Sequence, residues 1–497
     1  MKKLLVLSLL FALFFASCGD GAKQDQTGEK SEEANAEGDQ SIETGSEDAE
    51  QRMEPNLPEV DLEGYEFTFL THLYDGDDWI NPTPLELIAE QQTGEPVNDA
   101  VYLRNMKITE KYNFDIKMEP ASDEKSAMNK AAKAGDDLYD AAIMFNNNIP
   151  GIVTSGLLSN IANLPYVDLS QPWWDPAVNS MSIDHKNYLL GGDLLILDNE
   201  ATNALLFNKD LMADLGLGLP YDLVNAGKWT LDKMNDFVRG AASDLNGDGL
   251  MKADDDRWGY VAFNDTFHAM LVGGGGTLAL KDESDIPYID FASPRNLAVT
   301  ELVMDIMYDK ENTLNIQADV SPSDLWTASY VNSFDGGRAL FMWVRMRVVE
   351  RFRGMEANFG IIPMPKYDEA QKNYCSVVNP YTGVLLGVPI SAGEPEKISI
   401  VLEALAAESR YTLQPAYYDV VLTRKYARDE ESEEMLDVIF NSRVYDIGAV
   451  YSFGGVFIDF INLAAKSDRN VISYYEKKIG SMENAIAKLV DTFQSME

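Results

Sequence analysis

Tyr139-Asp140-Ala141-Ala142-Ile143-Met144-Phe145 is a nearly continuous apolar run with polar residues on both sides. A short run of this kind is typical of a strand that is buried on both faces, and such strands belong mainly to parallel sheets covered by helices. Helical spacing precedes it between Ala127 and Gly135. The run therefore predicts an α/β layer with a mostly parallel sheet.

The chain on either side continues this alternation. Tyr65–Leu70 alternates like a strand, Asn98–Tyr112 has helical spacing, and Phe114–Met118 alternates again, so the body is expected to open with a β-α-β unit. Ala204–Phe207 and Ala339–Trp343 are predicted to be strands of a second layer. Two amphipathic helices are predicted towards the carboxyl end, at 398–407 and 482–493.

Length and composition limit the class of protein. The chain has 497 residues, is 45% hydrophobic and carries a formal net charge of -41. Two lobes are expected, because the body exceeds the usual size of one core. The acidity argues against binding to nucleic acid or to an anionic membrane. Cys375 is the one cysteine of the body, so it is predicted to be an inert thiol without an intrachain disulfide partner there.

The amino terminus predicts a lipoprotein signal peptide over residues 1–17. Lys2 and Lys3 precede an apolar run that is shorter than the roughly 20 residues needed to span a bilayer, and small residues lead to Cys18. Lipidated Cys18 would anchor the chain to the outer face of the cytoplasmic membrane. An ordinary secretory signal and a membrane span are the alternatives. Residues 18–55 are predicted to form a disordered acidic tether.

From about residue 62 to residue 497 the chain resembles the extracellular solute-binding proteins of bacterial ABC importers, in the branch that includes sugar and oligosaccharide binders. No single motif is diagnostic, but their order is fairly specific. The stretches that carry the resemblance are Asp137-Leu138-Tyr139-Asp140-Ala141-Ala142 with Ser155-Gly156-Leu157-Leu158, Asn203-Ala204-Leu205-Leu206-Phe207-Asn208-Lys209-Asp210-Leu211, Lys228-Trp229-Thr230, Trp258-Gly259-Tyr260, Gly273 to Gly276, Phe334-Asp335-Gly336-Gly337-Arg338-Ala339-Leu340-Phe341, and Phe359-Gly360-Ile361-Ile362-Pro363-Met364-Pro365-Lys366.

The resemblance implies a two-lobe periplasmic-binding-protein-like fold, with hinge strands and a ligand cleft between the lobes. Lobe one would comprise 62–198 plus 358–410, and lobe two 200–357 plus 411–497. Closure of such lobes by hinge motion turns ligand occupancy into a shape that a transporter recognises. The resemblance implies a monomer that passes a solute, expected to be an oligosaccharide, to the membrane subunits of an ABC permease.

Ligand sites in such folds lie on loops beyond the carboxyl ends of strands. Amides, carboxylates and aromatic rings on these loops suit the hydroxyls and apolar faces of sugars, although an individual aromatic residue is more often part of the core. For Trp173 and Trp174, packing in the core is favoured, with a place in the cleft as the alternative. The candidate ligand residues are Tyr74, Asp75, Asp78, Trp79, Asn146, Asn147, Asn148, Asn264, Asp265, Phe267, Trp343, Arg345 and Arg347, with Asn199 and Glu200 near the crossover between lobes.

One loop matches the calcium-binding pattern D-x-[DN]-x-[DN]-G. Oxygen ligands at positions one, three, five, seven and twelve describe an EF-hand-type loop. Position twelve holds Asp, which is one methylene shorter than the usual Glu, so the affinity is expected to be lower than that of a standard loop. A solvated acidic turn is the alternative. The predicted ligands of this structural Ca²⁺ are Asp244, Asn246, Asp248, the Leu250 carbonyl and Asp255.

The sequence gives little support for catalysis. His72, His185 and His268 are far apart in the chain, and no zinc, nucleophile-elbow or complete P-loop motif is present. A glycosidase needs two suitably separated carboxylates, and a chain with 81 acidic residues leaves that alternative open. A binder of peptides or other solutes, or a ligand sensor, is the other alternative. The prediction is a binding protein and not an enzyme.

Overall fold

The computed structural model describes residues 52–73, 84–321, 332–352, 354–418 and 430–496. Residues 52–497 form one compact unit. Within the described residues, no helix is both long enough and apolar enough to cross a membrane. The signal peptide, Cys18 and the tether up to residue 51 lie outside the described residues, so these three assignments stay predictions.

The first sheet has four strands in the order β12-β3-β1-β2. They are β1 (Tyr65–His72), β2 (Phe114–Ala121), β3 (Ala141–Phe145) and β12 (Val384–Gly387). β1 pairs in parallel with β2 and β3, whereas β12 is antiparallel to β3. The predicted β-α-β opening is confirmed, because α1 (Pro96–Tyr112) joins β1 to β2. All five residues of β3 are buried, as the apolar run predicted.

Local signals set the ends of the helices around this sheet. Asp123 caps α2 (Glu124–Ala134) by accepting a hydrogen bond from the Ser126 amide, and Gly135 ends it at a φ of 71°. A side-chain acceptor at the amino end and a left-handed glycine at the carboxyl end satisfy backbone groups that a helix leaves unpaired. These two caps therefore fix where α2 begins and ends.

The second sheet has five strands in the order β10-β4-β9-β5-β8. They are β4 (Asn203–Asn208), β5 (Trp258–Ala262), β8 (Thr313–Asn315), β9 (Ala339–Arg345) and β10 (Phe359–Ile362). β9, β5 and β8 run in parallel, while β4 is antiparallel to both β9 and β10. The strands predicted at Ala204–Phe207 and Ala339–Trp343 thus share one sheet, separate from the first.

The remaining elements cover these sheets and connect them. The predicted carboxyl-terminal helices are present as α12 (Pro395–Tyr411) and α17 (Val471–Ser495). The other helices are α3 (Ile149–Val153), α4 (Leu197–Glu200), α5 (Lys209–Asp214), α6 (Tyr221–Asn225), α7 (Leu231–Ala241), α8 (Thr266–Gly273), α9 (Pro294–Met307), α10 (Ile316–Asp319), α11 (Met346–Val349), α13 (Leu413–Tyr417), α14 (Glu430–Asn441), α15 (Ile447–Val450) and α16 (Val456–Ala465), with 3₁₀ turns η1 (Ile161–Asn163), η2 (Pro176–Met181), η4 (Glu350–Phe352) and η6 (Phe453–Gly455). Two small sheets pair β6 (Ala279–Lys281) with β7 (Pro287–Ile289) and β11 (Ser376–Val377) with β13 (Arg443–Val444).

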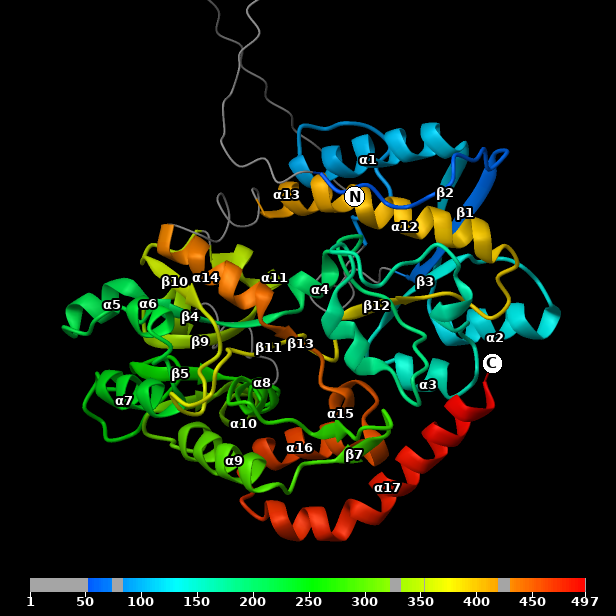
Figure 1. Cartoon of the computed structure of the whole chain (residues 1–497). Helices are drawn as coiled ribbons and strands as arrows, with labels where there is room; N and C mark the ends of the chain where they lie inside the picture. Colours follow the sequence, from blue (N-terminus) through cyan, green and yellow to red (C-terminus); the bar gives the residue numbers. More distant parts are fainter. Residues whose placement is uncertain (1–51, 74–83, 322–331, 353, 419–429, 497) are drawn as a thin grey trace, which may run out of the picture. The chain divides into compact units, whose positions relative to one another are not determined.

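Each large sheet has an apolar core on both faces. Helices α1 and α12 contribute to the core on one face of the four-stranded sheet (Figure 1). Its other face packs against the carboxyl half of α17, where Phe493 shares a cluster with Met144. Two further clusters cover the five-stranded sheet. Burial on both faces explains why the strands of both sheets read as apolar runs.

Two segments lie differently from the expected lobe boundaries. The chain from residue 358 was expected in lobe one, but β10 pairs with β4 and lies in the five-stranded sheet. Residues after 411 were expected in lobe two, but Tyr445 and Phe493 pack against residues of the four-stranded sheet. Apolar pattern alone identifies a strand or helix without identifying the sheet against which it packs. The remaining boundaries stay a prediction.

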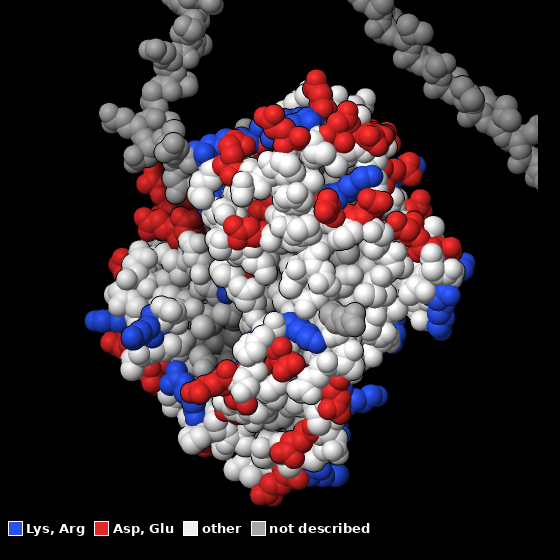
Figure 2. Space-filling model, turned by 45° about the vertical axis from the view of Figure 1, so that its right-hand side comes forward, with Lys and Arg blue, Asp and Glu red and all other residues white. Residues whose placement is uncertain are grey.

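The acidity of the chain extends to its folded body. On the face drawn in Figure 2, acidic side chains gather towards the top, whereas the middle of this face is mainly uncharged. A surface of this kind offers little attraction to an anionic polymer.

Candidate functional site

The carboxyl ends of three strands of the five-stranded sheet lie at one edge. β9 ends with Trp343 and Arg345, and the parallel neighbours β5 and β8 end beside it. Asn315 lies opposite Ala262 at the end of β8, and Asn264 follows β5. Because β4 is antiparallel, its first residue, Asn203, pairs with Arg345 at the same edge. The order of the strands thus collects polar residues from four places in the chain.

The four-stranded sheet presents a similar edge. Thr71 lies near the end of β1, and Asn146 directly follows the parallel strand β3. Both side chains are buried. The edge therefore places a hydroxyl and an amide where ligands of open α/β sheets bind.

The segment from Asn379 to Gly383 joins the two edges. The amide of Asn146 donates to the Gly383 carbonyl at 2.8 Å, and the Asn379 side chain donates to Asp265 Oδ2 at 3.1 Å. Backbone hydrogen bonds from Asn379 to the Ala201 carbonyl and from Gly383 to the Asn379 carbonyl hold the segment in place. A methyl group on Gly383 would lie 2.6 Å from Asn146 Nδ2, so glycine is required for this approach.

Several buried polar atoms at these edges have no hydrogen-bond partner among the described residues. Asn146 is fully buried, and neither its Nδ2 nor its Oδ1 is bonded. The same is true of the Trp343 indole N–H and of three further amide oxygens. We call this set the site edge: Asn146 Nδ2 and Oδ1, Asn203 Oδ1, Asn264 Oδ1, Asn315 Oδ1 and Trp343 Nε1. Buried polar groups are normally hydrogen-bonded, so a group of unbonded polar atoms at strand ends indicates a place for water or a ligand.

The charged groups at the carboxyl edge of the five-stranded sheet are paired. Arg345 attracts the Asp265 carboxylate, and Asn379 donates to it; burial nonetheless raises the pKa of Asp265. Arg347 Nη1 lies 2.7 Å from Glu200 Oε2. The six atoms that make up the site edge belong to uncharged side chains, which suit an uncharged ligand rich in hydroxyls.

Two aromatic candidates lie in the core. Phe267 is fully buried and stacks on Phe460 with ring centroids 4.5 Å apart, so it offers no free face to a ligand, which corrects the prediction. It follows β5 as predicted, but it is already inside α8 and faces the core. The Trp343 ring is 4% exposed and packs on Phe263, so its N–H, and not its face, is the group that remains available.

The other candidates are spread more widely. Asn147 and Asn148 are exposed, and Asn148 donates to Glu124 Oε2 at 3.2 Å. Glu124 was not predicted as a site residue; it is 2% exposed, and its Oε1 has no partner in the described part of the chain. The signal for it was its place directly after β2, at the same edge as Asn146. Tyr74, Asp75, Asp78 and Trp79 lie outside the described residues.

The remaining candidate, Asn199, is buried in a hinge network described below, where its Nδ2 donates to Gln414. Burial raises the pKa of Cys375, in keeping with an inert thiol.

Trp173 and Trp174 belong to the core, as predicted. Their indole N–H groups donate to the two oxygens of Glu403 at 3.0 and 2.8 Å. Glu403 is 1% exposed, and burial raises its pKa to about 7 despite these donors. This cluster is buried like the site edge, but both of its indole N–H groups have hydrogen-bond acceptors.

A surface pocket lies at the opposite, amino-terminal edge of the four-stranded sheet. Its lining includes Tyr65 and Asp140, with Glu66, Glu119 and Asp137 beside them. The Asp140 carboxylate already accepts hydrogen bonds from the Tyr65 hydroxyl and the Thr68 amide. Ligands of open α/β sheets bind at carboxyl ends of strands, so we assign the ligand site to the other edge.

The predicted calcium loop forms a series of tight turns. Asp244 accepts hydrogen bonds from the amides of Gly247 and Gly249, and Asp248 lies 2.5 Å from Lys252 Nζ. Among the described residues no three His, Cys, Asp or Glu side chains are gathered closely enough to hold a metal ion. Asp244, Asp248 and Asp255 are thus not assembled around a common point.

The fold is similar to that of ABC substrate-binding proteins. One similar structure is the ABC substrate-binding protein Lmo0181 from Listeria monocytogenes in complex with cycloalternan, at 13% identity and a TM-score of 0.50, covering 87% of this chain and 100% of that one. Another is a cyclo/maltodextrin-binding protein complexed with maltotetraose, at 15% identity and a TM-score of 0.53, covering 87% of this chain and 98% of that one.

A third is the maltose/maltodextrin-binding domain MalE from Bdellovibrio bacteriovorus bound to maltotriose, at 13% identity and a TM-score of 0.50, covering 86% of this chain and 100% of that one. No model of a known protein family matches the sequence, and no curated protein matches it. At these identities the likeness establishes the two-lobe fold, and the ligand has to be argued from the site.

Proposed function

We propose that this chain is a binding protein that captures an uncharged oligosaccharide between the carboxyl edges of its two sheets. The site edge is the observation that supports the proposal. Each asparagine amide can both donate to and accept from hydroxyl groups, and the Trp343 N–H adds a donor. A sugar that met these groups would replace the cost of burying them unpaired, about 1–3 kcal/mol each, with hydrogen bonds.

Three further parts of the proposal rest on the sequence and on the fold. Cys18 is the lipidation site, the body acts outside the cytoplasmic membrane, and an ABC permease receives the sugar. The similar structures described above are of binding proteins. Replacement of Cys18 by alanine should move the chain from the membrane fraction to the soluble fraction. Unchanged membrane association would contradict the anchor while leaving sugar binding open.

The test of binding is calorimetric titration of the purified chain with maltotetraose, raffinose, mannotriose and a cyclic glucan, with product analysis of each mixture. We expect heat with at least one glycan and no breakdown of it. Breakdown would favour the glycosidase alternative, for which Glu200 and Asp265 supply carboxylates near the site edge. A parallel titration with a peptide mixture covers the other alternative: heat with peptides and with no glycan would favour a peptide-binding protein.

We propose separately that the loop from Asp244 to Asp255 binds a structural Ca²⁺. Asp244, Asn246, Asp248, the Leu250 carbonyl and Asp255 would supply its oxygens. The short Asp255 and the Lys252 ammonium on Asp248 weaken the site. Calcium should raise the unfolding temperature of the chain and not of an Asp244→Ala variant; equal responses of the two would contradict the site.

A further inference from the structure

Three segments of chain pass between the two sheets, and they are hydrogen-bonded to one another. The first contains α4 and leads into β4, the second runs from β11 to β12, and the third contains β13. The Ser376 amide donates to the Ser442 carbonyl at 2.8 Å, and the Val378 amide donates to the Val444 carbonyl at 3.0 Å. The Asn379 amide donates to Ala201 at 2.9 Å, which ties the second segment to the first.

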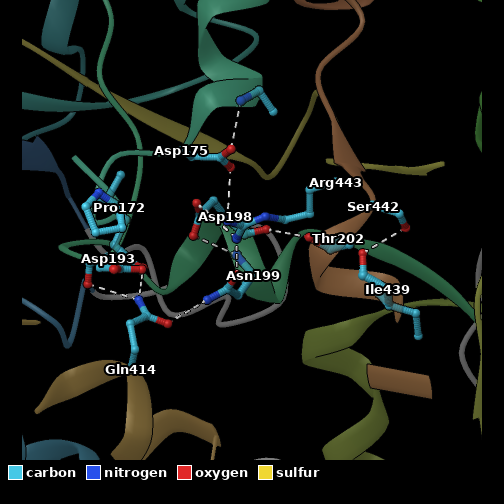
Figure 3. A network of polar contacts seen from close by, with 12 residues as sticks. Pro172, Asp175, Asp193, Asp198, Asn199, Thr202, Gln414, Ile439, Ser442 and Arg443 are labelled. Carbon is cyan, nitrogen blue, oxygen red and sulfur yellow. Dashed lines mark hydrogen bonds and ion pairs between the residues drawn. The ribbon is translucent and has the colours of Figure 1, made fainter. Parts of the chain in front are cut away.

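The Arg443 side chain is the centre of a buried ionic network across these segments (Figure 3). Its Nη2 lies 3.0 Å from Asp175 Oδ2, and its Nη1 lies 3.4 Å from Asp198 Oδ2. Nη1 also donates to the Asn199 side-chain oxygen. Asp175 precedes η2 beside the four-stranded sheet, whereas Asp198 and Asn199 are on α4, so one guanidinium connects β13 to two other parts of the chain.

Further polar contacts extend the network to α12 and α13. Asn199 Nδ2 donates to Gln414 Oε1 at 3.2 Å, and Gln414 Nε2 donates at 3.0 Å to the carbonyls of Asp193 and Leu195. Arg410, at the end of α12, lies 3.2 Å from Asp193. The network therefore fixes α4 from both sides.

Stability alone is a weak reason for such a network. The Asp198 and Asp175 side chains are 1% and 7% exposed, and that of Arg443 is 15% exposed. Removing charges of this kind from water offsets most of their attraction, so a buried ion pair is weak evidence for net stability, and its best-attested other role is to fix the register of packed elements. In this chain the elements held in register would be the three segments that cross between the sheets, called the crossings from here on.

The same crossings carry the site edge. β11, which pairs with β13 through Ser376 and Arg443, accepts the Asn203 side-chain amide at the Val377 carbonyl, 2.7 Å away. Asn379, two residues beyond β11, holds Asp265. A change in how β13 lies on α4 would therefore shift Asn203 relative to Asn146.

We propose that Arg443 is a positioning residue, which locks the three crossings in one register and so sets the distance and orientation between the two sheets. It does not touch the ligand in this account, and the proposal does not depend on the ligand being a sugar. Loss of Arg443 leaves Asp175 and Asp198 without their shared cation, and α4 loses its direct side-chain contacts with β13.

The experiment is a distance measurement between the two sheets without ligand. Spin labels replace the exposed residues Lys130 on α2 and Asp236 on α7, in a chain with Cys18 and Cys375 changed to serine. We expect Arg443→Gln to widen the electron–electron distance distribution about two-fold, as an unlocked hinge does. Arg443→Lys should restore most of the original width, because it keeps a cation beside both aspartates.

Matched controls separate positioning from folding. Arg469→Gln removes an exposed ion pair with Asp305, and it should leave the distribution unchanged. If Arg443→Gln does not fold, Asp175→Asn takes its place, since Asn retains the oxygen that accepts from the Ala177 amide. A folded Arg443→Gln or Asp175→Asn chain with the original distribution would overturn the proposal, whatever the sugar titrations give.

Discussion

The Trp173–Trp174–Glu403 cluster and the site edge are both buried and both contain tryptophan and polar side chains, but their hydrogen bonding differs. In the first, each indole N–H meets a carboxylate oxygen. In the second, the Trp343 N–H and both polar atoms of Asn146 meet no partner within the described ranges. A satisfied cluster is explained by the fold itself, whereas an unsatisfied one leaves room for a partner that the described residues do not supply.

The largest expected effect tests the satisfied cluster. Trp173→Ala should lower the free energy of unfolding by about 3–5 kcal/mol, because it removes a fully buried ring and one donor to Glu403. Denaturant unfolding measures this loss, with the exposed residue Leu103 changed to alanine as the control. A loss below about 1 kcal/mol would mean that this cluster is not structural.

The pH dependence of stability is a second test of the Trp173–Trp174–Glu403 cluster. Burial raises the pKa of Glu403 from an unfolded value of 4.5 to about 7, so the folded chain holds an extra proton between these values. The free energy of unfolding should therefore fall by about 2–3 kcal/mol from this group as the pH rises from about 4.5 to about 7. Glu86 and Asp198, whose pKa values are raised by burial to about 7, act in the same direction.

Unfolding curves at pH 5 and pH 8 measure the slope. Glu403→Gln should make it shallower, whereas Glu110→Gln, at an exposed position of α1, should leave it unchanged. A chain more stable at pH 8 than at pH 5 would contradict the assignment.

Two buried asparagines test the comparison directly. Asn296 is 1% exposed, its Nδ2 donates to Thr277 and Asp290, and its Oδ1 accepts from the Thr277 amide. Asn296→Ala should cost about 1–3 kcal/mol of stability, because it leaves those partners unpaired. Asn146→Ala should cost far less, or stabilise the chain, because its side chain has no partner among the described residues to lose. Equal destabilisation would show that Asn146 is bonded in the folded chain.

A pair of tryptophans gives the smallest expected effect. Trp229 is fully buried and donates to the Pro363 carbonyl at 3.1 Å, so Trp229→Phe should cost about 1 kcal/mol or more. Trp343→Phe should leave stability nearly unchanged and weaken sugar binding. Thermal unfolding and sugar titration of both variants separate the two roles. A larger loss of stability for Trp343→Phe than for Trp229→Phe would contradict the comparison.

The sequence predicted the strands and the α/β class because buried strands and capped helices leave local patterns. The run 139–145 and the asparagines after it correctly placed β3 and an amide at its carboxyl end. The pairing of β10 with β4 was not predictable, because apolar pattern carries no information about partners distant in the chain.

The site was predictable only in part. Asn146, Asn264 and Trp343 were expected from their place after strands, but Asn203 and Asn315 join them through an antiparallel pairing and a short edge strand that periodicity does not reveal. Phe267 follows β5, as expected, but its side chain is buried in the core. The position of a residue after a strand does not reveal in which direction its side chain points. Which tryptophan is satisfied depends on partners such as Glu403, which is 230 residues from Trp173 in the chain.

The most direct test of the account is calorimetric titration of the glycan panel into the full chain and into its Asn146→Ala and Asn296→Ala variants, at a temperature where all three are folded. We expect one glycan to bind the full chain and Asn296→Ala alike, and to bind Asn146→Ala at least about ten-fold more weakly. Equal binding to all three, or binding of no glycan by the full chain, would contradict the claim that the unsatisfied edge is a sugar site.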